Sequence, residues 1–150
     1  MQLSSRFSIA VHTLLCVALF EDACKVTSDF IAGSAGVNPV VVRQTLGRLK
    51  RAGLAAVAAG TGGARLAREP ERISLLDIYR AVDLVERERL FNFHERPNPL
   101  CPVGRNIRRL LDGSLREAQQ ALENHLAGHT LADLLEDLRD QENSEALRAE

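Results

Sequence analysis

Apolar residues recur every three or four positions along most of this chain, which is the period of an amphipathic α-helix. The first helix is predicted from about Ser5 to Phe20, and apolar side chains lie nearly all round it. A helix of this kind must be covered on more than one side. We expect a second subunit to supply part of that cover.

The apolar run from Phe7 to Phe20 follows Arg6 and could also be a secretory signal peptide. Against this, Glu21 and Asp22 stand where small cleavage-site residues belong, and the run is shorter than the roughly 20 residues that span a membrane. The three cysteines are too few and too widely spaced for a disulfide framework. A buried first helix in a reduced, cytoplasmic protein is the preferred interpretation.

Two capping signals predict a pair of short helices joined by a tight turn. Thr27 to Asp29 is a capping cluster, and the helix that it starts would end at Gly36. Asn38 followed by Pro39 starts a second helix that runs to Ala52. Two helices so joined form a helix-turn-helix.

A wing and three further helices are expected after the helix-turn-helix. Short apolar segments at 54–59 and 64–67 flank a glycine-rich turn, which predicts a β-hairpin. Ser74 and Asp77 have capping-box spacing and start a helix. A long helix is predicted from near Val103. A last helix starts at a Thr130–Asp133 capping pattern, and its tail after Asp140 is expected to fray.

The predicted fold class is therefore mainly α with a small β-hairpin wing. Residues 1–82 are expected to form a winged helix-turn-helix domain, and residues 83–150 a linker and a helical dimerisation region.

Charge is sorted along this nearly neutral chain. Residues 1–68 hold eight basic and three acidic residues, a net charge of +5, and residues 69–150 hold eleven basic and seventeen acidic residues, a net charge of −6. No acidic residue lies between Asp29 and Glu69, whereas six basic residues do. This pattern indicates that the first half contacts a polyanion.

The helix from Pro39 to Ala52 has the pattern of a DNA recognition helix. Its outer face presents Gln44 and Arg51, and glutamine and arginine can pair with adenine and guanine edges. The predicted DNA-binding residues are Ser28, Asn38, Val40, Val41, Arg43, Gln44, Arg48, Arg51, Thr61 and Arg65. The alternative is a winged-helix protein-interaction module without DNA binding, which has no reason to keep a bare basic face. The sequence contains no phosphate-binding glycine loop, nucleophile elbow or paired carboxylates, so an enzyme is not expected.

Four segments together resemble the Rrf2 family of bacterial winged-helix transcription regulators: 36–54, the glycines at 60–63, Ser74–Arg80 and Asn98–Gly104. The resemblance implies a homodimer, most often a repressor, that places two recognition helices in the major groove of a palindromic operator. The long C-terminal helix would pack against its partner through one apolar stripe, formed by Ile107, Leu110, Leu111, Leu115, Ala118 and Leu122. The expected partners are double-stranded DNA and a second copy of the chain, with no membrane.

The chain departs from the family pattern at two places. Members that sense through an iron–sulfur cluster have three closely spaced cysteines before the long helix, and here that region has only Cys101. No cofactor and no metal are therefore expected. Cys101 precedes a helix N-terminus, so it is a candidate redox-sensing thiol, and the alternative is a small buried residue near the hinge. In the wing, Ala59 stands where relatives often have arginine, and Arg65 is a candidate substitute.

Overall fold

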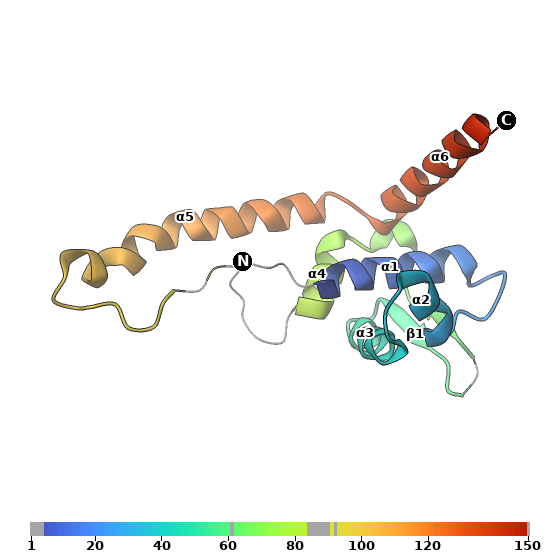
Figure 1. The fold of residues 1–150 in the computed structure, drawn as a ribbon, viewed down its shortest axis with the longest axis horizontal. Coiled ribbons are helices and arrows are strands. Elements are labelled where there is room, and N and C mark those ends of the chain that lie inside the picture. The colour runs from blue at the N-terminus through green and yellow to red at the C-terminus, as the bar shows by residue number, and fades with distance from the viewer. Residues whose placement is uncertain (1–4, 61, 84–90, 92, 150) are drawn as a thin grey trace.

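The computed structural model describes residues 5–60, 62–83, 91 and 93–149. The N-terminal part contains helices α1 (Ser5–Phe20), α2 (Ser28–Ala35) and α3 (Pro39–Arg51) and strands β1 (Ala55–Val57) and β2 (Ala64–Leu66). The short 3-10 helix η1 (Pro70–Arg72) and helices α4 (Leu75–Asp83), α5 (Pro102–Ala127) and α6 (Leu131–Ala149) follow. Helices α5 and α6 extend in different directions from the body formed by α1 to α4 and the wing (Figure 1). The predicted fold class, mainly α with a hairpin wing, is confirmed.

The turn between α2 and α3 forms for the predicted reasons. The Thr27 side chain accepts a hydrogen bond from the Phe30 amide at 3.2 Å and caps α2. Gly36 has the left-handed conformation, with φ of 65°, that ends this helix. The Asn38 side chain then accepts from the Val40 amide at 2.8 Å and starts α3. One helix therefore ends and the next begins within three residues.

Strands β1 and β2 form the antiparallel wing, with Ala56 opposite Arg65. The wing lies against α1 and α3. Ala55 and Ala64 are buried, so small side chains allow the hairpin to lie close to these helices. This packing explains why alanine-rich strands, which have little intrinsic β-propensity, form here.

Helix α1 is covered in large part by its own chain. It contacts α2, α3, α4, α6 and β2, and Leu14 and Val17 are completely buried. Part of its apolar surface lies outside this core, because Leu19 is 44% exposed and Ile9 and Phe20 are half-buried, so the expected cover from a second subunit stays a prediction. The contribution of α6 to this core was not visible in the local sequence pattern.

Helix α6 returns to the body after α5. Leu131 and Leu135 are buried, and α6 contacts α1 and η1. Ser74 and Thr130 form an isolated antiparallel bridge that ties the start of α4 to the start of α6. Helix α6 continues to Ala149, past Asp140, after which the tail was expected to fray. Good helix-forming residues and the cap at its start favour this continuation, although its last turns are exposed.

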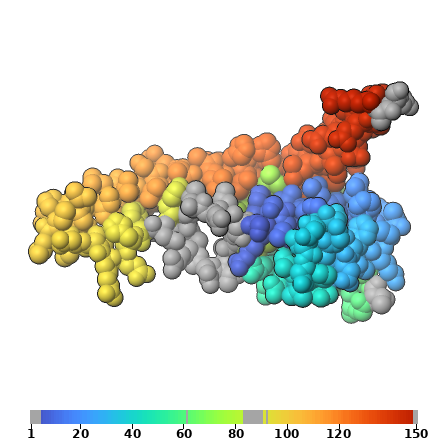
Figure 2. Space-filling model, in the orientation of Figure 1, coloured from blue at the N-terminus to red at the C-terminus, as the bar shows by residue number. Residues whose placement is uncertain are grey.

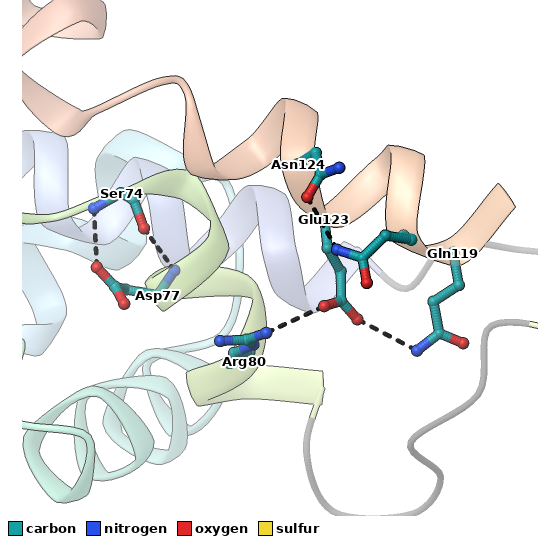
Figure 3. A network of polar contacts seen from close by, with 7 residues as sticks. Ser74, Asp77, Arg80, Gln119, Glu123 and Asn124 are labelled. Carbon is teal, nitrogen blue, oxygen red and sulfur yellow. Dashed lines mark hydrogen bonds and ion pairs between the residues drawn. The ribbon is translucent and has the colours of Figure 1, made fainter. Parts of the chain in front are cut away.

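Helix α5 is held to the body near its C-terminal end. Arg80 of α4 forms an ion pair with Glu123 of α5 at 3.0 Å, and Gln119 donates to the same carboxylate at 3.2 Å (Figure 3). Its 26 residues extend over about 39 Å at 1.5 Å per residue. The opposite end of α5 therefore lies far from α1 to α4, as the space-filling view shows (Figure 2). Among the described residues, no helix is long and apolar enough to span a membrane.

Candidate nucleic-acid interface

Helix α3 divides into a buried and an exposed face, as its sequence predicts. Val42 and Leu49 are completely buried in the core. On the opposite face, Gln44 and Arg51 are exposed and Val40 is 49% exposed. Gln44 and Arg51 therefore point away from the protein, and the opposite face of α3 is packed in the core.

Gly47 lies in the middle of this exposed face. A Cβ atom built at this position would meet nothing within 4 Å, so the open space beside it is not filled by the protein. Because Gly47 has no side chain, the surface of α3 is indented at this position. This shape suits close approach of another molecule along the helix.

The start of α2 lies beside α3. The Arg43 guanidinium donates to the Ser28 hydroxyl at 3.4 Å, which joins α3 to the first turn of α2. Helix α2 has eight residues, and its first amides carry the positive end of the helix dipole. Ser28 and Arg43, both predicted site residues, are thus brought together, and Asn38 lies in the turn between their helices.

A groove with a volume of about 630 Å³ separates α2 and α3 from the wing. Arg43, Lys25 and Lys50 line it, with Asp29 as its acidic member. Lys25 and Lys50 line this groove but were not among the predicted DNA-binding residues. Lys50 follows Gly47 by three residues on the same helix, so the helical period could have placed it on the same face. Lys25 lies outside any helix, and no local pattern indicates its position.

Arg48 lies on the other flank of α3, toward α4. It is half-buried, and its Nη1 atom donates to the Val82 carbonyl at 2.9 Å. Arg48 was predicted as a DNA-binding residue that flanks the exposed face, and its guanidinium also caps the end of α4. The bond joins α3 to the last turn of α4.

Two residues of the wing, Thr61 and Arg65, were predicted to bind DNA, and the structure describes one of them. Arg65 is exposed on β2. Thr61 lies outside the described residues. Val41, at the start of α3, is half-buried rather than fully exposed.

Cys101 is the N-cap residue of α5 and is partly exposed. Hydrogen bonds from the backbone amides of Gly104 and Val103 lower the pKa of its thiol, and desolvation acts weakly in the opposite direction. The backbone at Asn98 lies against the first turn of α5, since a Cβ atom at Gly104 would be 2.3 Å from the Asn98 carbonyl oxygen. Cys101 therefore has the predicted place before the long helix, where its thiol pKa is lowered.

The apolar stripe of α5 is largely uncovered. Leu110 is 65% exposed and Leu111 is 42% exposed, and Ala118 is also exposed. Ile107, Leu115 and Leu122 are half-buried, and no described residue of α5 is fully buried. Val103, one turn before the stripe, is 63% exposed.

Candidate metal ligands do not gather in the part of the chain that the structure describes. There, no group of three or more histidine, cysteine, aspartate or glutamate residues could hold a metal ion. Cys16 is buried in α1, Cys24 is exposed just after it, and Cys101 begins α5. His125 and His129 are exposed, with their ring centroids 4.7 Å apart.

A model of the Rrf2 family, described as "Iron-dependent Transcriptional regulator", matches residues 3–137. The iron in that description does not fit the described ligands of this chain. An iron–sulfur cluster needs several thiolates in one place, whereas the three cysteines lie in separate elements. Cys101 in particular is at the end of α5 remote from the body (Figure 1).

Individual relatives support the same assignment. YwnA of Bacillus subtilis (strain 168), named as a candidate HTH-type transcriptional regulator, is 43% identical over 91% of this chain and 98% of its own length. The solved structure of a candidate DNA-binding protein is 38% identical, with a TM-score of 0.68 over 87% of this chain and 99% of that one. A candidate transcriptional regulator from Lactobacillus plantarum is 26% identical, with a TM-score of 0.77 over 96% of this chain and 99% of that one. The protein belongs to the Rrf2 family of transcriptional regulators and is not an enzyme.

Proposed function

We propose that this protein is a homodimeric, sequence-specific DNA-binding repressor that acts on a palindromic operator in the cytoplasm. The observation that carries the proposal is the exposed face of α3, which combines Gln44 and Arg51 with the glycine gap at residue 47. The 1–82 winged helix-turn-helix would contact DNA, and residues 83–150 would hold the dimer together.

In this proposal the start of α3 reads the major groove. Arg43 and Gln44 would contact base edges, because arginine and glutamine can each form two hydrogen bonds with one base. Val40 and Val41 would contact apolar groups such as thymine methyls, and Asn38 would lie at the groove edge. Arg43 is already oriented by its bond to Ser28, which lowers the entropy lost on binding.

Phosphate contacts would come from both sides of α3. Ser28 at the start of α2 and Lys50 in the groove face one side, and Arg51 follows on the outer face. Arg65 would extend from the wing toward the minor groove, with Thr61 near the tip. Arg48 would act indirectly, by holding α3 against the carbonyl of Val82.

The dimer is proposed to form through α5. Exposed leucines such as Leu110 and Leu111 lie on a helix that extends beyond its own core, and burial against a second copy would remove them from water. A two-fold dimer would also supply two recognition helices for the two halves of a palindrome. Binding over a promoter would then exclude the transcription machinery, which is how a repressor of this family would act.

Cys101 is proposed as the signal-sensing residue, without an iron–sulfur cluster. Its lowered thiol pKa increases the fraction of reactive thiolate at neutral pH. Oxidation of the thiolate by a peroxide to a sulfenic acid, with release of water, or exchange with a small disulfide, with release of its second thiol, would disturb the start of α5 and so change the spacing of the two recognition helices.

Selection from a randomised duplex pool tests the function. The purified wild-type chain should enrich a palindromic motif, and the Arg43→Ala/Gln44→Ala variant should enrich none or a different one. A matched control, Gln120→Ala on an exposed face of α5, should enrich the wild-type motif. Absence of any enriched motif with the wild-type protein would contradict sequence-specific binding.

A further inference from the structure

The outer edge of the wing is attached to the connection between α1 and α2. The Ala64 amide donates to the Val26 carbonyl at 2.8 Å, and the Leu66 amide donates to the Glu21 carboxylate at 2.8 Å. Amides of an antiparallel strand point alternately to its two sides, so these two face away from β1. Both outward amides of β2 are therefore bonded to the segment that follows α1.

Glu21 is well placed to hold the wing rigidly. Its own amide donates to the Val17 carbonyl at 2.9 Å, so its backbone continues the last turn of α1. Its side chain is half-buried and stands where the carbonyl group of a third strand would stand. The second attachment is equally close, since a Cβ atom at Gly63 would lie 3.0 Å from the Val26 nitrogen.

The negative charge of Glu21 is unfavourable beside a surface that would bind DNA. Glu21 lines a hollow together with Asp22 and Arg65, beside the basic groove. A carboxylate close to DNA phosphates weakens binding by like-charge repulsion. An acidic side chain without a structural role at this place would therefore only reduce the affinity for DNA.

We propose that Glu21 is a positioning residue for the wing. By accepting the hydrogen bond from the Leu66 amide, it fixes the direction in which β2 leaves the body and the place where Arg65 is held relative to α3. This inference rests on the proposed DNA-binding function. It differs from that function in assigning a role to a residue that does not contact DNA.

Substitution of Glu21 separates positioning from simple charge by the sign of the effect. If Glu21 is a bystander, Glu21→Ala removes a repulsive charge and tightens DNA binding. If Glu21 positions the wing, the same change weakens binding about threefold to tenfold for each half-site, which corresponds to the loss of one hydrogen bond in each subunit. Glu21→Gln keeps an oxygen acceptor and should bind at least as tightly as Glu21→Ala, within about twofold of the wild type.

Fluorescence anisotropy on the selected duplex at constant salt is the test. Asp22→Ala is the matched control, because Asp22 is an exposed neighbour with the same charge, and it should bind as tightly as the wild type or more tightly. Arg65→Ala should weaken binding, and the double variant Glu21→Ala/Arg65→Ala should bind no more weakly than Arg65→Ala. Tighter binding by Glu21→Ala, or additive losses in the double variant, would overturn the proposal.

Amide hydrogen exchange of the free protein tests positioning without DNA. The Leu66 amide should exchange at least about tenfold faster in Glu21→Ala, while the Ala67 amide, which donates to the Leu54 carbonyl, keeps its protection. Unchanged exchange at Leu66 would refute the role of Glu21. If the wild type fails to bind DNA but Leu66 responds as expected, the proposed function fails while the anchoring of the wing stands. If Glu21→Ala does not fold, Glu21→Gln should show a smaller acceleration at Leu66 alone.

Discussion

Replacing Leu110 by alanine should dissociate the dimer while leaving the folded subunit intact. Leu110 is 65% exposed in the single chain, so it contributes little to the stability of its own subunit. If α5 forms the interface, the exposed part of this side chain is buried there instead. Removal of three carbon atoms at about 0.8 kcal/mol each, scaled by that exposed fraction, costs about 1.5 kcal/mol per subunit.

The two-fold symmetry of a homodimer doubles this cost. Each subunit contributes one Leu110, so dimerisation should weaken by about 3 kcal/mol, which raises the dissociation constant about 100-fold. Sedimentation equilibrium over a range of protein concentrations measures this constant directly. Far-UV circular dichroism at a concentration where the variant is monomeric should retain the helical spectrum, because the core lies within one chain.

Gln120→Ala provides the matched control for Leu110→Ala. Gln120 is exposed on the side of α5 opposite the apolar stripe, so its loss should leave the dissociation constant within about twofold of the wild type. A wild-type protein that sediments as a monomer at micromolar concentration would refute the reasoning. So would a Leu110→Ala variant with an unchanged dissociation constant.

Three further predictions concern single side chains. Lys50→Ala should weaken binding to all duplexes similarly and reduce the slope of log Kd against log salt by about 1.8, because each of the two subunits loses one phosphate contact, as measured by anisotropy between 50 and 200 mM salt, and an unchanged slope would exclude that contact. Cys101 should be alkylated faster than the exposed Cys24 at pH 7, because backbone amides lower its thiol pKa, and DNA binding by Cys101→Ser should not respond to diamide. Hydrogen bonds from Thr130 lower the pKa of Asp133, so its stabilisation of α6 should be complete above the pKa of the unfolded chain and be lost as the pH falls through the folded pKa. Thermal unfolding of Asp133→Asn and wild type should therefore differ at pH 7 and converge in acid, and a difference independent of pH would contradict this cap.

Local signals predicted the N-terminal fold well because each end of a helix there is set by its own residues. Asn38 and Gly36 fix the turn between α2 and α3 through bonds to neighbouring amides and through backbone conformation. The capping box of Ser74 and Asp77 forms reciprocally, with both bonds at 3.0 Å. These interactions span three residues, so the sequence alone reveals them.

Interactions between distant segments were not predictable in the same way. The bond from Arg48 to the Val82 carbonyl joins residues 34 positions apart, and no local pattern indicates it. No local pattern indicates the burial of Leu131 in the core or the position of Lys25 in the groove either. The exposed face of α3 could be predicted because its periodicity is local, whereas the groove beside it depends on where the wing lies.

Footprinting on the selected duplex tests the central claim most directly. Wild-type protein should protect two patches on one face of the DNA, with their centres one helical turn of about 10–10.5 base pairs, or a multiple of it, apart. The Arg43→Ala/Gln44→Ala variant should lose both patches at the wild-type concentration, while Gln120→Ala retains them. An identical footprint from wild type and the double variant would contradict recognition of DNA through α3.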